Sequence, residues 1–255
     1  MVKKYDVIIV GAGIAGLTAA IYTARAGKST LVLESKTYGG AIINTLKISN
    51  YPALMDVSGP ELAKRLYDQA TSLGAEFEFA EALEVIDGEV KTIRTDDGDF
   101  MARTVILAMG TEPRKLSKSQ AVDAGKRPIS YCATCDGAFY KGKPVVVVGS
   151  GKSAKNEISY LEGIASKVYN IHHDDPIPKD AEAVFVAIGR VPNTKILKGV
   201  VDLDADGYVI SGEDCKTSAP GIFVVGDCRT KVVRQLITAA GDGAVAAGAA
   251  IEYLK

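Results

Sequence analysis

An apolar strand that runs directly into a glycine-rich loop constrains the fold of this chain most strongly. The strand is expected over residues 7–10, and the loop reads Gly11-Ala12-Gly13-Ile14-Ala15-Gly16; a helix over residues 17–25 then leads to a second strand over residues 30–33, which ends at Glu34. In such a βαβ unit the glycines let the backbone approach a pyrophosphate at the helix N-terminus, and an acid about 20 residues further on binds a ribose. A glycine turn alone also serves plain strand-to-helix packing, but the complete pattern predicts a Rossmann-like α/β unit that binds a dinucleotide.

The same pattern returns in the middle of the chain. A strand over residues 144–148 enters Gly149-Ser150-Gly151, and a helix to about Gly163 and a strand over residues 167–171 follow. Three further apolar strands end in glycine, within residues 104–110, 183–189 and 221–226. A meander of short strands is expected over residues 73–103, and a helix rich in Ala and Gly over residues 235–253. The chain therefore contains two nucleotide-type loops, and its 255 residues suffice for one or two domains.

Two cysteines lie one helical turn apart beside a carboxylate, in Cys132-Ala133-Thr134-Cys135-Asp136. At a helix start this spacing suits an intramolecular disulfide, because the helix dipole favours the attacking thiolate. Asp136 is then available to handle the proton. A structural disulfide or half of a zinc site would have the same spacing, but a zinc site needs a second pair, and Cys215 and Cys228 are too far apart to supply one. The segment favours a redox-active disulfide without a metal, and Cys215 and Cys228 are interpreted as buried apolar residues.

Charge and hydropathy argue against several classes of partner. A formal net charge of -1 with scattered lysines provides no basic footprint for nucleic acid. No apolar run approaches the roughly 20 residues of a membrane span, and the first apolar strand breaks at Gly11, too early for a secretory signal. Four cysteines are too few for a disulfide scaffold, so a reducing compartment fits. We expect a cytoplasmic protein.

Six motifs resemble, in their order, those of the low-molecular-weight thioredoxin reductases. They are the Gly11 loop, Gly39-Gly40 with Asn50-Tyr51-Pro52, the strand end from Ala108 to Arg114, the segment from Cys132 to Asp136, the Gly149 loop, and Gly226-Asp227-Cys228 with Arg234-Gln235 and Thr238 to Gly243. The match covers nearly the whole chain. It implies an FAD domain formed by both chain ends, residues 1–115 and 191–255, with a smaller redox domain inserted at residues 116–190. It also implies a homodimer that reduces thioredoxin or a thioredoxin-like protein.

The resemblance also assigns roles to individual residues. Cys135 would face the flavin, Cys132 would exchange with the protein substrate, and Asp136 would act as acid and base. The positions implied around FAD are Gly11, Gly13, Gly16 and Glu34 at the ADP half, Gly40, Thr45 and Asn50 toward the flavin, Gly110 also at the cofactor, Asp227 on the ribityl chain, and Arg234 and Gln235 beside the ring. The N-terminus of the last helix would favour negative charge on a reduced flavin. Ala41 and Met109 replace the family's usual Gln and Thr, which weakens individual contacts.

The sequence departs from the family where a second nucleotide would bind. The family's His-Arg-Arg…Arg cluster, which grips the 2′-phosphate of NADPH, is replaced by His172-His173-Asp174-Asp175, and these acids would repel a phosphate. Only 11 residues separate Ile171 from Ala183, which is short for a helical crossover, so residues 184–189 are expected to pair by a tight return. The central domain then holds about half of the usual nucleotide-binding fold. Lys152 and Lys155 could meet phosphates, but a solvated helix face is favoured for both.

Three electron supplies stay open at this point. The chain resembles the ferredoxin-dependent branch of the flavin thioredoxin reductases, and we favour a one-electron protein donor that reduces FAD without NADPH. The second possibility is a nicotinamide nucleotide bound at a degenerate site, with NADH preferred because Asp174 or Asp175 could serve its adenosine ribose. The third is an FAD-binding scaffold, natural or artificially shortened, that does not turn over. The intact dithiol with Asp136 argues against a pure binding module.

Overall fold

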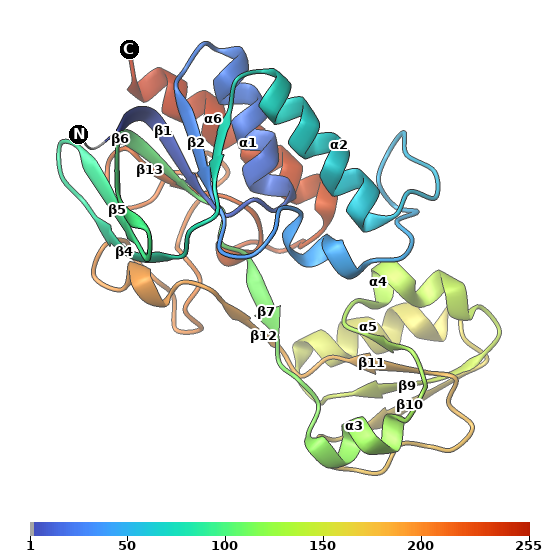
Figure 1. The fold of residues 1–255 in the computed structure, drawn as a ribbon. Helices are drawn as coiled ribbons and strands as arrows, with labels where there is room; N and C mark the ends of the chain where they lie inside the picture. Colours follow the sequence, from blue (N-terminus) through green and yellow to red (C-terminus); the bar gives the residue numbers. More distant parts are fainter. Residues whose placement is uncertain (1–2) are drawn as a thin grey trace. The chain divides into compact units, whose positions relative to one another are not determined.

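The computed structural model describes residues 3–255, which form two compact units (Figure 1). Unit 1 comprises Met1–Thr111 and Pro192–Lys255, apart from the first two residues, and unit 2 is Glu112–Val191. The chain passes between the units through β7 (Thr111–Pro113) and β12 (Arg190–Pro192), which pair with each other. The expected α/β class, with a Rossmann-like domain made of both chain ends, is confirmed.

A seven-stranded sheet forms the centre of unit 1, in the order β3-β2-β1-β6-β5-β4, with β13 also paired to β6. The parallel strands are β1 (Lys4–Val10), β2 (Thr30–Leu33), β3 (Glu76–Glu78), β6 (Gly98–Leu107) and β13 (Ile222–Val224). The antiparallel strands β4 (Ala82–Ile86) and β5 (Lys91–Thr95) join β6 and confirm most of the expected meander. Only β3 differs: it pairs in parallel with β2, because the helix α2 (Gly59–Ser72) before it provides the crossover.

Alternating side chains of β1 divide the core of unit 1 into two layers. Ile9 packs with the layer of α1 (Ile14–Arg25), α2 and α6 (Leu236–Tyr253), which cover one face of the sheet (Figure 1). Ile8 packs on the opposite face with side chains of β4, β5 and residues 197–209. A Cβ on Gly243 of α6 would lie 2.3 Å from a carbonyl oxygen of α1, so the two helices cross in close contact. This contact explains why the last helix is rich in small residues.

Unit 2 contains a four-stranded parallel sheet in the order β10-β9-β11-β8. Its strands are β8 (Ile129–Ser130), β9 (Pro144–Val148), β10 (Lys167–Ile171) and β11 (Ala183–Val186). On one face, Phe185 packs with α4 (Ala133–Asp136) and α5 (Lys152–Glu162). On the other, Val184 packs with α3 (Lys118–Ala124) and residues 177–181. The sheet is therefore covered on both faces, as parallel sheets require.

The connection from β10 to β11 corrects one expectation. β11 pairs in parallel with β9, with Ala183 opposite Val145, so the chain crosses the sheet and the expected tight return is wrong. Residues 172–182 are enough for this crossover because they form no helix. The side chains of Ile177 and Ala181 are buried directly against the sheet instead. Unit 2 thus closes its core with only part of a nucleotide-binding fold.

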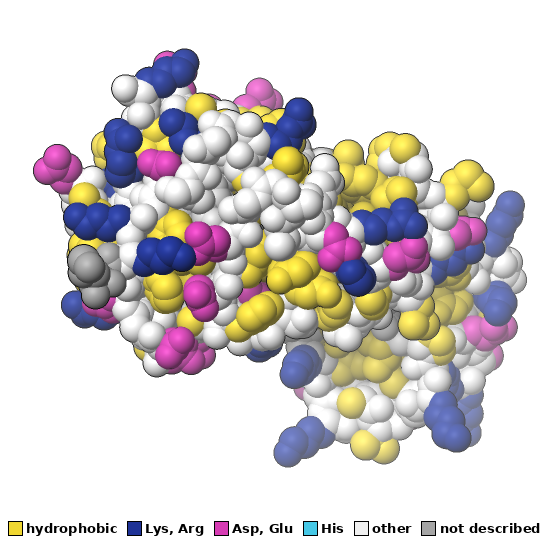
Figure 2. Space-filling model, turned by 45° about the horizontal axis from the view of Figure 1, so that its top comes forward, with side chains coloured by type: hydrophobic (Ala, Val, Ile, Leu, Met, Phe, Trp, Pro, Cys, Tyr) yellow, Lys and Arg dark blue, Asp and Glu magenta, His cyan; other side chains and the backbone are white. Residues whose placement is uncertain are grey.

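No helix within residues 3–255 has the length and hydropathy needed to cross a membrane. On the face drawn in Figure 2, positive, negative and hydrophobic side chains are interspersed. Such a mixture differs from the continuous basic stripe that follows a nucleic-acid backbone.

Candidate active site

The carboxyl ends of four parallel strands meet at one edge of the sheet in unit 1. Val10 of β1 pairs with Leu33 of β2 and with Leu107 of β6, and Leu107 pairs with Val224 of β13. The first glycine loop, Glu34, Gly110 and η4 (Gly226–Cys228) follow these strand ends. Open α/β sheets bind their ligands at this edge. The topology therefore brings the predicted cofactor residues from both ends of the chain to one place.

Two of the three loop glycines are required by packing, and the third borders open space. Gly11 has φ +106°, and a Cβ there would lie 2.4 Å from the Ala108 carbonyl oxygen. A Cβ on Gly16 would lie 2.0 Å from the Gly11 carbonyl oxygen. Around a Cβ on Gly13, by contrast, no atom of another part of the described chain lies within 4 Å. Gly13 leaves the room that a pyrophosphate needs at the start of α1.

The Glu34 carboxylate is held against the glycine loop. One of its oxygens accepts the backbone N–H of Ala12 at 2.8 Å, and the other accepts that of Lys36 at 3.0 Å. An ionised carboxylate has about four lone-pair sites, so it can also accept ligand hydroxyls. The acid is thus fixed beside the loop, where dinucleotide folds bind a ribose.

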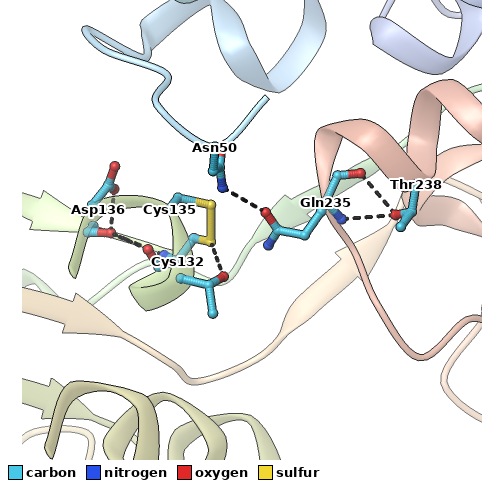
Figure 3. The surroundings of a disulfide bond; sticks show 8 residues. Asn50, Cys132, Cys135, Asp136, Gln235 and Thr238 are labelled. Atoms are coloured by element: carbon cyan, nitrogen blue, oxygen red, sulfur yellow. Dashed lines mark hydrogen bonds between the residues drawn. A yellow bond between two sulfur atoms is a disulfide. The ribbon is translucent and has the colours of Figure 1, made fainter. Parts of the chain in front are cut away.

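A short 3-10 helix brings a second turn to the loop. In η1 (Gly40–Asn44), Gly40 has φ +55°, and a Cβ there would lie 3.2 Å from Gly13 Cα. Thr45 ends η1, and its carbonyl oxygen accepts the N–H of Gly59 at 2.8 Å. The side-chain amide of Asn50 donates to Gln235 Oε1 at 3.1 Å (Figure 3). Asn50 and Gln235 therefore lie together although 185 positions separate them in the sequence.

The segment between β13 and α6 carries the other predicted flavin residues. Asp227 lies in η4, and Arg234 donates to the carbonyl oxygens of Asp227, Arg229 and Lys231 at 3.3, 3.1 and 3.2 Å. Gln235 is the N-cap of α6 and forms a capping box with Thr238 (Figure 3). These hydrogen bonds of Arg234 go to the backbone, and its guanidinium lies 4.4 Å from the centre of the Tyr208 ring, so this side chain shapes the turn that presents Asp227.

Sequence reasoning missed a buried ionic cluster on α6. Asp242 accepts the N–H of Gly226 at 2.9 Å, two bonds from Arg229 at 2.9 Å each, and one from Lys231 at 2.7 Å. Burial acts to raise the pKa of Asp242, but the bonds from Arg229 and Lys231 outweigh it, so this pKa lies below its ordinary value. The only signal in the sequence is an acid in the middle of an Ala- and Gly-rich helix, whose other acid, Glu252, lies in its last turn. The cluster fastens the turn that carries Asp227 to α6.

In unit 2, Cys132 and Cys135 form the predicted disulfide, with their Cα atoms 5.3 Å apart (Figure 3). Cys132 is the N-cap of α4, and its carbonyl oxygen accepts the N–H groups of Cys135 and Asp136 at 3.2 and 3.1 Å. The hydroxyl of Thr134 lies 3.3 Å from the sulfur of Cys132. Asp136 ends the same short helix, and its carboxylate accepts the Ser130 hydroxyl at 2.6 Å. The two thiols and the acid are therefore presented by one turn of helix.

A second carboxyl group, which sequence reasoning also missed, contacts the first residue of α4. Glu157 of α5 has its pKa raised to about 7 by burial, although the backbone N–H of Ala133 and the charge of Arg190 act to lower it. One of its carboxyl oxygens is buried without a hydrogen-bond partner. No pattern in the sequence distinguishes Glu157 from a solvated residue on an amphipathic helix.

The other two cysteines behave as the sequence predicts. Cys215 and Cys228 are free and buried in unit 1. Burial raises the pKa of each thiol to about 11, so both stay protonated and unreactive near neutral pH. Neither has the properties of a redox thiol.

Unit 1 is Rossmann-like and carries a dinucleotide loop, and unit 2 is a second α/β unit that carries a disulfide between cysteines three positions apart. Together these features define the class of the protein as a flavin-dependent disulfide oxidoreductase. The family model described as pyridine nucleotide-disulphide oxidoreductase matches residues 5–181 and 174–243. The chain is 36% identical to the thioredoxin reductase of Listeria innocua over 302 residues, which cover 99% of this chain and 95% of that protein.

Solved structures agree with this match. The thioredoxin reductase of Streptococcus pyogenes superposes with a TM-score of 0.92 at 32% identity and covers 98% of both chains. The ferredoxin-flavin thioredoxin reductase of Clostridium acetobutylicum superposes with a TM-score of 0.64 at 28% identity, over 99% of this chain and 98% of that one. The chain belongs to the pyridine nucleotide-disulphide oxidoreductases, within the low-molecular-weight thioredoxin reductases, and is an FAD-dependent enzyme of the thioredoxin-disulfide reductase type.

Proposed function

We propose that this protein reduces the disulfide of thioredoxin, or of a thioredoxin-like protein, with electrons that pass from a ferredoxin-like donor through FAD to Cys132 and Cys135. The relatives named thioredoxin reductase support the substrate class. One observation carries the proposal on the donor: the chain that follows β10, where the family has its arginine cluster, is tied to α3 and to Arg127 and contains acids in place of arginines.

FAD would be held at the carboxyl edge of the sheet in unit 1. The space beside Gly13 and the fixed Glu34 carboxylate support binding of its ADP half there. The residues proposed to hold the cofactor are Gly11, Gly13, Gly16, Glu34, Gly40, Thr45, Asn50, Gly110, Asp227, Arg234 and Gln235. The N-terminus of α6, which begins after Gln235, would favour negative charge beside the cofactor. Bound FAD would supply the two-electron chemistry.

The dithiol would then carry the electrons to the protein substrate. Cys135 would face the cofactor and Cys132 would attack the substrate disulfide, first forming a mixed disulfide that Cys135 resolves. Each cycle re-forms the bond between Cys132 and Cys135 and releases two substrate thiols. Asp136 would supply and recover the proton, which its place on the same short helix supports.

Unit 2 argues against NADPH as the donor. Gln120 of α3 is 1% exposed and donates to the carbonyl oxygens of His172 and Asp175 at 3.0 Å each. Arg127 donates to the carbonyl oxygens of Lys179 and Ala181 at 3.0 and 2.8 Å. The crossover is therefore fastened to the rest of unit 2 along much of its length. A 2′-phosphate would meet acids there, and no arginine fork is available in residues 172–182 to bind it.

The two aspartates of this segment are also engaged locally. Asp175 accepts the N–H of His172 at 2.8 Å. Hydrogen bonds from Ser117 and His173 lower the pKa of Asp174. These contacts reduce the support for a ribose of NADH at either acid. A ferredoxin-flavin thioredoxin reductase has the same fold, which is compatible with a one-electron donor.

The alternative is a nicotinamide-dependent thioredoxin reductase with a degenerate nucleotide site. The 36% identity to relatives named thioredoxin reductase favours it. The alignment with the Listeria protein spans 302 residues against 255 in this chain, so the relatives contain a stretch that this chain lacks. A shortened FAD-binding scaffold without turnover is the third possibility.

Anaerobic mixing of the FAD-loaded protein with single donors separates the three functions. We expect NADPH and NADH to leave the oxidised flavin spectrum unchanged, and reduced ferredoxin to bleach it and to yield thioredoxin thiols. Fast bleaching by NADPH would restore the ordinary reductase, and bleaching by NADH alone would favour the NADH enzyme. Reduction of the flavin without any thioredoxin thiols would indicate the scaffold.

We further propose a homodimer located in the cytoplasm, as the family resemblance implies. Leu46, Met55 and Val232 of unit 1 are each more than 90% exposed, and burial of such apolar side chains would favour association with a second copy. Sedimentation at micromolar concentration should give twice the mass of the chain, and Val232→Asp should shift it toward the monomer. A wild-type monomer over this range would refute the dimer.

A further inference from the structure

A buried hydroxyl connects the acid of the dithiol segment to the backbone of its first cysteine. Ser130 ends β8 and is 6% exposed. Its Oγ donates to Asp136 Oδ2 at 2.6 Å and accepts the backbone N–H of Cys132 at 3.1 Å. The carbonyl oxygen of Cys132 is also 3.3 Å from the same Oγ. One side chain therefore touches the carboxylate and both backbone groups of the thiol residue.

The hydrogen bonds of Ser130 can be satisfied both when Asp136 is ionised and when it is protonated. A hydroxyl donates one bond and accepts two. While Asp136 is ionised, Ser130 donates to it and accepts the Cys132 N–H. When Asp136 carries a proton, its O–H can donate to Ser130, and the Ser130 proton turns to the Cys132 carbonyl oxygen. Ser130 is buried, and Cys132 and Asp136 are half-buried. The Ser130 hydroxyl keeps its hydrogen-bond partners in both states, so neither state leaves this buried group with a costly unmade bond.

We propose that Ser130 is the positioning residue that lets Asp136 release and recover its proton within the dithiol cycle. This inference rests on the acid and base role proposed above for Asp136. When two electrons enter the disulfide, the S–S bond breaks and two thiolates result. One proton from Asp136 converts one thiolate into a thiol and leaves a carboxylate, to which Ser130 donates.

The same hydroxyl serves the return step. The thiol gives its proton back to the Asp136 carboxylate, and the Cys132 thiolate attacks the substrate disulfide, forms a mixed disulfide and expels one substrate thiolate. The Cys135 thiolate then attacks the Cys132 sulfur, re-forms the disulfide and expels the second substrate thiolate, and both substrate thiolates take protons from the solvent. Asp136 then donates to Ser130, whose proton moves to the Cys132 carbonyl oxygen. Ser130 takes part in no bond to sulfur, so its effect acts entirely through Asp136 and the Cys132 backbone.

Three substitutions isolate the hydroxyl. Ser130→Ala removes it, and Ser130→Gly is a second variant without a hydroxyl should the first fail to fold. Ser130→Thr keeps a hydroxyl and should restore wild-type behaviour. Ser117→Ala is the matched control, because Ser117 is also a hydroxyl of unit 2 that accepts a backbone N–H, that of Gln120, at the start of α3.

The measurement uses the full-length, FAD-loaded protein reduced with tris(2-carboxyethyl)phosphine. The rate of iodoacetamide alkylation at Cys132 and Cys135 is followed across pH by mass spectrometry. Loss of one hydrogen bond to a charged group should move the inflection of the alkylation profile of Ser130→Ala to higher pH by about one unit. Ser130→Thr and Ser117→Ala should follow the wild-type profile, because neither loses this bond.

The outcomes separate this inference from the proposed function. A Ser130→Ala or Ser130→Gly profile that superimposes on wild type overturns the inference, even if turnover falls, because a merely structural loss would not move the inflection. Asp136→Asn keeps a side chain that can bond to Ser130 but has no proton to give. If Asp136→Asn retains the inflection and full turnover, the acid and base role of Asp136 fails. If Asp136→Asn loses both the inflection and turnover while Ser130→Ala keeps the wild-type profile, only the role of Ser130 fails.

Discussion

At the scale of single residues, the two thiols of the disulfide are expected to have different tasks. Cys132 is the N-cap of α4, with Thr134 Oγ1 at 3.3 Å from its sulfur, and Cys135 lies inside the helix. We expect Cys132→Ser to stop turnover with every competent donor, because the remaining thiol, that of Cys135, is assigned to the cofactor side and not to the substrate disulfide. The measurement is the yield of thioredoxin thiols per flavin under anaerobic conditions.

Cys215→Ser is the control for this substitution. Cys215 is a buried free thiol, and burial raises its pKa to about 11, so its loss should leave turnover unchanged. If Cys132→Ser kept normal disulfide reduction, the dithiol mechanism would be wrong.

The pH dependence of stability should contain a contribution from Glu157. Burial raises its pKa from an ordinary 4.5 to about 7, so the folded protein holds the proton more tightly than the unfolded chain. The contribution of the protonated Glu157 to the free energy of unfolding is fully present below about pH 4.5 and is lost as the pH rises through 7. The full shift corresponds to roughly 3 kcal/mol, and partial exposure reduces this figure.

Glu157→Gln is neutral at every pH and should remove this loss. We expect its unfolding free energy to exceed that of wild type at pH 8 by about 1–3 kcal/mol and to approach it at pH 5. Urea unfolding at the two pH values measures the difference. Glu162→Gln, an exposed acid of the same helix, should follow wild type. If the unfolding free energy changed by the same amount between pH 5 and pH 8 in wild type and in Glu157→Gln, Glu157 would not be protonated in the folded state.

The sequence predicts those residues whose chemistry is local. Cys132 and Cys135 are three positions apart, and their pairing could be predicted from spacing alone. Glu34 was found through its distance from the glycine loop, which the βαβ unit sets. Glu157 and Asp242 depend on contacts with Ala133 and Gly226 that only the packed chain creates. A single sequence holds no pattern for such contacts.

At the scale of elements, the buried cluster on α6 is expected to hold the η4 turn in place. Removal of one partner from a buried ion pair typically costs about 3–5 kcal/mol, because the remaining charges are left without compensation. Asp242→Asn would leave Arg229 and Lys231 in this condition, with side chains 10% and 6% exposed. We expect a loss of unfolding free energy of that size, together with faster release of FAD, measured by urea unfolding and by flavin fluorescence.

Lys231→Met is the matched control for the cluster. It leaves the paired bonds between Arg229 and Asp242, both at 2.9 Å, and the bond from Gly226, so the remaining cluster is neutral. Its effect should stay within about 1 kcal/mol. If Asp242→Asn were no more destabilising than Lys231→Met, the cluster would not fasten the turn.

Helices and strands with a strong apolar pattern could be predicted from the sequence, and helices and connections with mainly polar residues could not. The strands β1, β2, β6, β9, β10, β11 and β13 and the helices α1, α5 and α6 lie where the sequence predicts them, although β6 begins several residues earlier, and the two-residue strand β8 was not predicted. Helix α2 was missed although Ser58 caps it and a proline stands in its first turn. Helix α3 is short, and of its side chains Gln120 and Ala124 are buried, so it lacks a clear apolar period. The crossover over residues 172–182 was misjudged because side chains, instead of a helix, cover the sheet there.

At the scale of the whole molecule, the two ends of the chain form one unit around one sheet edge. This arrangement could be predicted only through the resemblance to a family, because strand patterns do not tell which strands pair. β13 joins β6 across more than 100 residues, and unit 2 lies between them in the sequence. The cofactor would therefore stabilise residues from both ends of the chain together.

Binding of FAD should accordingly raise the melting temperature of the protein stripped of flavin. A ligand at 100 times its Kd stabilises the folded state by about 2.7 kcal/mol, which corresponds to roughly 5–10 °C for a chain of this size. FMN should give little shift, because it lacks the adenosine ribose that the fixed Glu34 carboxylate is proposed to bind. Differential scanning fluorimetry with each flavin measures both values.

Glu34→Ala tests the origin of this preference. The variant should lose much of the shift with FAD, because the acid beside the glycine loop is gone, whereas Glu78→Ala, an exposed acid at the end of the neighbouring strand β3, should keep it. Denaturation of the purified yellow protein should release FAD and no FMN. Equal shifts with FAD and FMN, or a colourless protein that gains no flavin spectrum with FAD, would contradict a dinucleotide site at this sheet edge.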